Sequence, residues 1–239
     1  MIIEKNKIRW ISRNKLTNLL NSQALLKDIL SIEIINSNEL SDIKELSSYS
    51  QINKYIIVII SREYSFFLGL PFPFGNKKLS NPEDIVSLLT KDIVLGLLFF
   101  ELGSWVSGIV KYKKVLFSKR GSRYVKGRHK AGGQSQRRFE RNREKWIEGL
   151  NSKVYDDIKN YIIPEKSNID YFICLGDTHS LNTFIGSTDL NKIFGDKMLL
   201  KRSSIKNYNS KTIIKASSTL WSSKIYLDDK NAIVEKIKL

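Results

Sequence analysis

The tripeptide Gly132-Gly133-Gln134 is the part of the sequence whose residue types suggest chemistry. The run from Gly127 to Phe139 around it contains no carboxylate and no Cys or Ser with a partnered base, so it lacks a conventional nucleophilic site. Two adjacent glycines permit backbone angles and close approaches that other residues do not reach. A helix that follows them presents free N–H groups and its positive dipole end. The run therefore predicts a loop that positions a substrate and donates hydrogen bonds.

The positive charge of the chain is concentrated around this tripeptide. The 239 residues have a net charge of +16, and residues 111–145 contain 14 Lys and Arg against Glu140 and Glu144. Such an excess is typical of a protein with a polyanionic partner, first nucleic acid and second an anionic membrane. A solvated face, a flexible tail or an ordinary Gly-rich loop capped by Ser135 is the alternative. Because the segment is internal and contains glycines and aromatics, we expect a basic loop that faces phosphates.

The other reactive residue types give weaker signals. His129 could act as a general base, but its position among cations favours RNA contact. His179 follows Asp177 and Thr178, a pair typical of a helix cap, so local structure explains both His179 and Asp177. Cys174 lies in an apolar run and is expected to be buried, and a single cysteine excludes an internal disulfide and a cysteine-rich zinc site. We expect no metal site and no cofactor.

Hydrophobic periodicity predicts strands before the basic loop and a long helix after it. Glu101 interrupts the apolar run at 93–110, which fits two strands better than a membrane span. Apolar residues at steps of three, four and seven predict an amphipathic helix from Ser135 to Pro164, with a bend at Gly149. The expected strands are 55–60, 94–101, 104–110, 114–126, 169–175, 211–216 and 224–227, and the expected helices are 14–30, 81–91, 135–163 and one after 178.

This order of elements predicts an α/β (α+β) fold, a mixed β-sheet with packed helices. We expect two parts: an N-terminal helix and strand region at residues 1–90 with no assigned role, and a second domain at 91–239. Three tryptophans, Trp105, Trp146 and Trp221, are expected in the core. Tyr124 either packs inside the sheet or stacks on a base. The first residues lack the apolar core of a signal peptide, so a cytoplasmic protein is expected.

The basic loop carries a family resemblance. The run from Gly127 to Arg143 resembles the GGQ loop and following helix of archaeal and eukaryotic class I peptide-chain release factors. Residues 97–130, with Arg123-Tyr124-Val125 leading into the loop, look like the Vms-type (VLRF) release-factor family, which comprises peptidyl-tRNA hydrolases of ribosome quality control. The resemblance covers about residues 92–200 and implies a GGQ-domain-like fold for the second domain.

The resemblance also implies a mechanism and partners. Gln134 would stabilise developing charge through its backbone N–H and shape the water site, Gly132 and Gly133 would permit its approach, and the ribosome would complete the active site. The flanking cations would bind phosphates of large-subunit rRNA or of peptidyl-tRNA. These are Arg123, Lys126, Arg128, His129, Lys130, Arg137, Arg138 and Arg141. We expect a monomer with these two RNA partners and no membrane partner.

The chain departs from the class I release factors in its expected domains. Those proteins have a stop-codon-reading domain before the GGQ domain and another domain after it, whereas residues 1–90 contain no Asn-Ile-Lys-Ser motif. The departure favours stop-codon-independent release from stalled or split ribosomal complexes. Two alternatives stay open: a non-catalytic rRNA- or tRNA-binding module, and a nuclease acting on the tRNA 3′ end, for which no acid cluster is evident.

Overall fold

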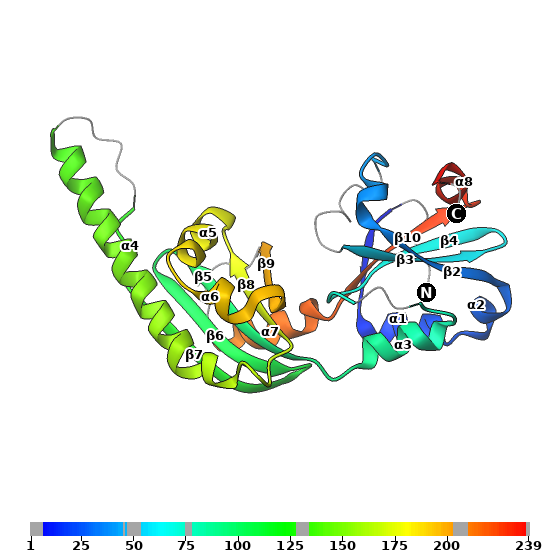
Figure 1. The fold of residues 1–239 in the computed structure, drawn as a ribbon, viewed down its shortest axis with the longest axis horizontal. Coiled ribbons are helices and arrows are strands. Elements are labelled where there is room, and N and C mark those ends of the chain that lie inside the picture. The colour runs from blue at the N-terminus through cyan, green and yellow to red at the C-terminus, as the bar shows by residue number, and fades with distance from the viewer. Residues whose placement is uncertain are drawn as a thin grey trace. The chain divides into compact units, whose positions relative to one another are not determined.

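The computed structural model describes residues 7–44, 46, 54–74, 78–127, 134–202 and 210–237. The chain forms two compact units (Figure 1). We call Met1–Lys91 together with Ser218–Leu239 the N-terminal unit, and Asp92–Ser217 the central unit. The sequence had indicated one domain for all of 91–239. The structure corrects that assignment, because the last strand of the chain pairs with strands from the first 70 residues.

The N-terminal unit contains an antiparallel sheet in the order β1-β10-β4-β3-β2. Its strands are β1 (Arg9–Ile11), β2 (Ile29–Asn36), β3 (Tyr55–Ser61), β4 (Tyr64–Gly69) and β10 (Ser223–Asp229). Its helices are α1 (Arg13–Leu20), α2 (Gln23–Asp28), α3 (Pro82–Thr90), α8 (Ala232–Ile237) and the short 3₁₀ turn η1 (Ser37–Leu40). The expected helix at 14–30 is therefore two shorter helices, and its last two residues begin β2.

Both faces of this sheet are covered, which explains why β3 is apolar throughout. Ile57 and Ile59 pack in a cluster with Leu16 of α1 and Ile85 of α3. Their neighbours in sequence, including Val58, belong to a second cluster with residues of η1 and α8. Successive strand residues point to opposite faces, so a strand between two apolar layers loses the polar alternation of a half-exposed strand.

The central unit contains a mixed sheet in the order β7-β6-β5-β8-β9. The strands β5 (Val94–Glu101), β6 (Ser104–Lys111) and β7 (Lys114–Ser122) form an antiparallel meander, while β8 (Tyr171–Gly176) and β9 (Met198–Arg202) continue the sheet in parallel with β5. The helices are α4 (Gln134–Tyr161), α5 (Thr178–Gly186), α6 (Leu190–Phe194) and most of α7 (Ser210–Leu220), whose last three residues belong to the N-terminal unit; the 3₁₀ turns are η3 (Ile163–Glu165) and η4 (Gly195–Lys197). The mixed sheet with packed helices confirms the predicted fold class.

The segments at 198–202 and 211–216 differ from the sequence prediction. Residues 211–216 were expected to form a strand because they contain Ile213 and Ile214, but they belong to helix α7. Ile213, Ala216 and Leu220 are buried at helical spacing, whereas Ile214 is 58% exposed. The short strand β9 has no distinctive pattern in the sequence and was not predicted.

Among the described residues, no helix combines the length and the apolar character needed to cross a membrane.

The central position of β10 predicts a large stability effect at Ile225. This residue is 1% exposed and pairs with Arg9 on one side and Leu68 on the other. Ile225→Ala should lower the free energy of unfolding by about 2–5 kcal/mol, measured by chemical denaturation. The control Ile214→Ala should change it by less than about 0.5 kcal/mol, since that side chain is exposed. Equal effects would contradict the assigned place of β10.

Burial of Cys174 predicts a thiol that does not react in the native protein. Cys174 lies in β8 with no exposed surface, and burial raises the pKa of its thiol well above the ordinary value. A thiol reagent at pH 8 should therefore modify it only after denaturation. A cysteine introduced at Leu116, which is 52% exposed, should react in the folded state. Rapid modification of Cys174 without unfolding would show that β8 is accessible.

Candidate functional site: the stalk of helix α4

The C-terminal half of α4 packs on the sheet of the central unit. Leu150, Val154 and Ile158 recur at steps of four and have no exposed surface. They join a core cluster with Phe172 of β8 and Phe184 of α5. This spacing places the three residues on one face of the helix, so the second half of α4 has a fixed contact surface.

A buried carboxylate connects the same half of α4 to two neighbouring strands. Asp157 is 9% exposed, and its Oδ2 accepts a hydrogen bond of 2.8 Å from Nε1 of Trp105 in β6. Its Oδ1 lies 2.7 Å from Nζ of Lys119 in β7. The hydrogen bond to Asp157 raises the pKa of Lys119. The contribution of Lys119 to the ion pair is therefore fully present below the ordinary lysine pKa and is lost as the pH rises through the raised pKa of this side chain.

Close packing around Trp105 requires a glycine in the adjacent strand. A Cβ atom on Gly121 would lie 2.0 Å from the indole ring of Trp105. The indole ring of Trp105 therefore lies against the backbone of β7 at Gly121, and its Nε1 donates to Asp157. Trp105 and Trp221, at 4% and 2% exposed, confirm two of the three expected core tryptophans.

The N-terminal half of α4 is exposed. None of residues 136–149 is buried, and Figure 1 shows this half extending beyond the sheet of the central unit. At 1.5 Å per residue, Gln134 lies about 22 Å along the helix from Gly149. Residues 136–149 contain five Lys or Arg and three Glu. A half-exposed helix of this kind is able to present its first turn to a partner at some distance from the sheet.

A short extended segment runs beside this exposed half. We call residues 123–127 and 134–149 together the stalk. Nη1 of Arg123 donates a 2.9 Å hydrogen bond to the carbonyl oxygen of Gly149. Tyr124 meets Trp146 edge-on with ring centroids 6.4 Å apart, and Nζ of Lys126 lies 5.4 Å from the centroid of Phe139. As the segment runs from Arg123 to Lys126, its contacts on α4 move from Gly149 back to Phe139, toward the start of the helix. The segment and the helix therefore run antiparallel, and we call them the two legs of the stalk.

The structure separates the predicted site residues into four groups. Arg128, His129, Lys130, Gly132 and Gly133 lie outside the described residues. Gln134 is the first residue of α4, at the end of the stalk. Arg137, Arg138 and Arg141 are exposed on the first turns of the helix, whereas Arg123 and Lys126 contact the helix from the other leg.

Several stalk residues have roles that the sequence did not reveal. Gly149, where a bend was expected, lies within a continuous helix, and a Cβ atom there would lie 2.5 Å from the Arg123 guanidinium. Trp146 was expected in the core but lies on the stalk between Tyr124 and Phe139. Tyr124 follows the end of β7 and is 75% exposed, so it does not pack inside the sheet.

The chemistry available at the described end of the stalk is hydrogen-bond donation and positive charge. The first backbone N–H groups of α4 have no partner within the helix, and its first turn contains no acidic residue. The described residues include no group of three or more His, Cys, Asp or Glu that could hold a metal ion. The end of the stalk therefore favours binding of anions or of oxygen atoms that gain negative charge.

The mixed-sheet unit carries a long helix that begins at Gln134, directly after Gly132 and Gly133 in the sequence. The model of the Actinobacteria/chloroflexi VLRF1 release factor family matches residues 94–222. This match covers more than half of the chain, and the protein belongs to that family. The resemblance to Vms-type release factors is thereby confirmed, and a translation-related role follows from it.

The solved structures that are similar to this chain have low sequence identity to it. The archaeal translation termination factor aRF1 is 15% identical with a TM-score of 0.40, covering 88% of this chain and 73% of that one. The Vms1 mitochondrial localization core is 16% identical with a TM-score of 0.46, covering 91% and 98%. Pelota of Archaeoglobus fulgidus is 11% identical with a TM-score of 0.31, covering 92% and 65%. No curated protein matches the chain in sequence.

The junction at Asp157 predicts a difference between two adjacent acids of α4. Asp157→Ala leaves the buried Nε1 of Trp105 without its acceptor and should lower the free energy of unfolding by about 2 kcal/mol. The control Asp156→Ala removes an exposed acid of the same helix and should change stability by less than about 0.5 kcal/mol. Thermal or urea unfolding measures both. Equal stabilities of the two variants would show that the carboxylate does not hold α4 on the sheet.

Proposed function

We propose that this protein hydrolyses peptidyl-tRNA on stalled or split ribosomal complexes, without a stop codon. The observation that supports the proposal most strongly is the position of Gln134 at the start of the exposed half of α4, in a member of a release-factor family. Ribosomal RNA of the large subunit and the tRNA itself are the proposed partners. The stalk enters the ribosomal cavity that holds the peptidyl-tRNA ester, and the sheet of the central unit stays outside that cavity.

The reaction is the hydrolysis of the ester between the peptide and the terminal adenosine. A water oxygen forms a bond with the carbonyl carbon, negative charge develops on the carbonyl oxygen, and the ester C–O bond breaks. The departing ribose oxygen takes one proton of the water, the other proton passes to the solvent, and the peptide leaves as a carboxylate. The backbone N–H of Gln134 donates to the developing negative charge, and its side chain positions the water. The ribosome supplies the remaining contacts.

Positive charge on the stalk supports an RNA-lined environment. Arg137, Arg138 and Arg141 are exposed within the first two turns after Gln134. Arginine binds phosphate oxygens with a planar set of donors, and such contacts position a protein without reading sequence. Arg123 has a further role at the other end of the stalk, because it joins the two legs at Gly149.

Release of labelled peptide from large ribosomal subunits that carry peptidyl-tRNA tests the proposal. Gln134→Ala and Gly133→Ala should each lower the release rate by about 100-fold, since each disturbs the placement of the donor or of the water. The control Lys153→Ala changes an exposed cation on the packed half of α4 and should release at the parent rate. Parent-like release by both loop variants would reject the proposed role of the tripeptide.

The products of the same assay separate the two other functions. Hydrolysis leaves tRNA of full length, whereas a nuclease shortens its 3′ end. A non-catalytic RNA-binding module binds subunits in a salt-dependent way and releases nothing. Intact ribosomes with and without a stop codon in the decoding site should release equally if the activity is independent of the codon.

A further inference from the structure

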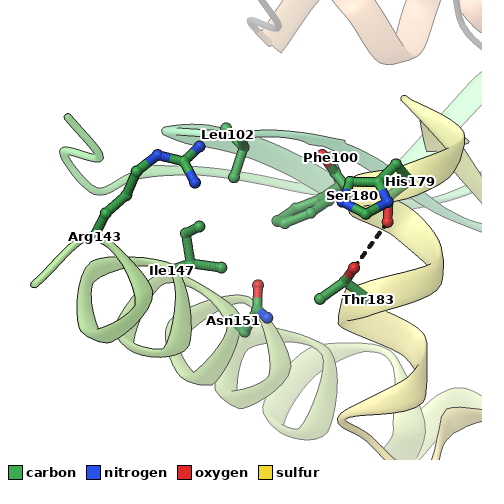
Figure 2. A pocket seen from close by; sticks show the side chains of 8 residues that line it. All are labelled: Phe100, Leu102, Arg143, Ile147, Asn151, His179, Ser180 and Thr183. Atoms are coloured by element: carbon green, nitrogen blue, oxygen red, sulfur yellow. Dashed lines mark hydrogen bonds between the residues drawn. The ribbon is translucent and has the colours of Figure 1, made fainter. Parts of the chain in front are cut away.

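The foot of the stalk has one covered side and one open side. Arg143, Ile147 and Asn151 line a small pocket on the side of α4 that faces α5 and the end of β5 (Figure 2). Arg141 precedes Arg143 by two residues, and two residues turn an α-helix by about 200°. The side of α4 that carries Arg141 therefore faces away from α5.

Three cations form a row on the open side of α4. Arg138, Arg141 and Lys145 are exposed and recur at steps of three and four, so they share one face of the helix. We call these three residues the cation row. The three glutamates of residues 136–149 recur at steps of four in a row of their own, about a quarter turn around the helix. Positive charge is thus concentrated on one face, which suits contact with the phosphates of a polynucleotide.

The extended leg of the stalk, residues 123–127, borders the cation row on the side away from the glutamates. Its ring contacts on α4 are Phe139 and Trp146, and each of these follows a member of the row by one position. One residue turns the helix by about 100°, so the leg lies about a quarter turn from the row. The sequence contains no Asp or Glu between Glu101 and Glu140, so the leg adds no negative charge.

Tyr124 is the exposed aromatic residue of this leg. It is 75% exposed, and no large apolar side chain among the described residues is more exposed. Trp146 meets its ring edge-on, with the ring centroids 6.4 Å apart. Arg123 and Lys126 hold the leg on α4 to either side of Tyr124. The ring is therefore fixed beside the cation row with most of its surface open to solvent.

This combination suits a single-stranded nucleic acid better than a protein partner. Proteins hold unpaired nucleotides by binding phosphates with cations and by stacking bases on aromatic rings. An interface with another protein has an apolar centre, whereas every exposed residue at positions 136–149 is charged or an asparagine. An exposed tyrosine among such residues provides a stacking surface for one base.

We propose that Tyr124 stacks on an unpaired base of large-subunit rRNA, while the cation row binds phosphates of the same strand. RNA as the partner rests on the proposed function, whereas the stacking contact rests on the exposed ring. Trp146, which contacts Tyr124, follows Gln134 by 12 residues, or about 18 Å along the helix. With Gln134 at the ester that ends the tRNA, a contact this far back on the side of the stalk falls on the rRNA wall of the cavity.

Binding to large ribosomal subunits without tRNA, measured by sedimentation, tests this contact. Tyr124→Ala should weaken binding about tenfold, because stacking of one base on an aromatic side chain contributes about that much. Tyr124→Phe keeps the ring and should stay within about twofold of the parent. Tyr124→Leu keeps an apolar side chain without a ring and should bind as weakly as Tyr124→Ala. The matched control Tyr112→Ala removes a tyrosine of the same basic segment, in the turn between β6 and β7, and should bind as the parent does.

The salt dependence of binding separates stacking from charge. Tyr124→Ala removes no charge, so the slope of log affinity against log salt concentration should equal that of the parent. Arg138→Gln removes one phosphate contact and should lower this slope by about one. A lower slope for Tyr124→Ala would mean that the variant has lost cation contacts, which contradicts stacking as the cause of its weaker binding.

Cross-linking by short-wavelength ultraviolet light tests the contact in the parent protein without any substitution. Peptide mapping of irradiated complexes should find rRNA attached to the peptide that contains Tyr124. Parent-like binding by Tyr124→Ala or Tyr124→Leu would overturn the proposal, and so would cross-links confined to other peptides. A loss of affinity that appears only when peptidyl-tRNA is bound would also overturn it, because the base would then belong to the tRNA.

The subunits in this experiment carry no peptidyl-tRNA, so its outcome is separate from that of the release assay. If the parent protein does not bind large subunits, the proposed function is rejected together with its partner. If the parent binds and releases peptide while Tyr124→Ala binds equally well, only the stacking contact is rejected.

Discussion

The hydrogen bond and ion pair that meet at Asp157 determine where α4 points. Trp105 and Lys119 come from adjacent strands, so a single carboxylate fixes both the rotation and the axial position of the helix on the sheet. The apolar residues around it resist separation of helix and sheet, but apolar contacts alone tolerate sliding more readily than directional ones. Because α4 is continuous, a shift of the helix at Asp157 also displaces Gln134, its first residue. The placement of Gln134 thus depends on a junction 23 residues further along the chain.

The stalk is stabilised differently from the core. Its legs are joined by one hydrogen bond, by aromatic edges and by a cation over a ring, all at the surface. Contacts of this kind contribute modestly, about 1 kcal/mol each, and leave local opening accessible. The packed half of α4 is fixed on the sheet, whereas the stalk is held by weak surface contacts. This combination keeps the direction of the helix and lets the stalk adapt to its target.

Much of this architecture follows from sequence patterns, and the exceptions have physical causes. The meander and the long amphipathic helix were predicted because their periodicities extend over many residues, and the strand after α4 was predicted from a short apolar run. Residues 211–216 were misassigned because two isoleucines suggest a strand, while burial in the structure follows the helical spacing of Ile213 and Ala216. The pairing of β10 with β4 was hidden because no local pattern reports contacts between residues about 160 positions apart.

The site was predicted only in part, because sequence patterns report local features and not contacts between distant residues. Gly-Gly-Gln, its cations and the following helix are neighbours in sequence. The role of Gly149 depends on an arginine 26 residues earlier, and the hydrogen bond of Asp157 depends on a tryptophan 52 residues earlier. Such relations arise from packing and are not visible in spacing along the chain.

The place of β10 has a consequence for the order of events during synthesis. Residues 92–217 hold every strand of their own sheet, so the central unit is able to fold as soon as it has been translated. The sheet that begins at Arg9 stays open in its middle until Ser223–Asp229 arrives, because β10 separates β1 from β4. The part of the protein that is made first is therefore completed last, and chains interrupted before residue 223 contain a folded centre beside an unfinished sheet. Such fragments expose the edge of β4 and the apolar faces around it, which are features that chaperones and proteases recognise.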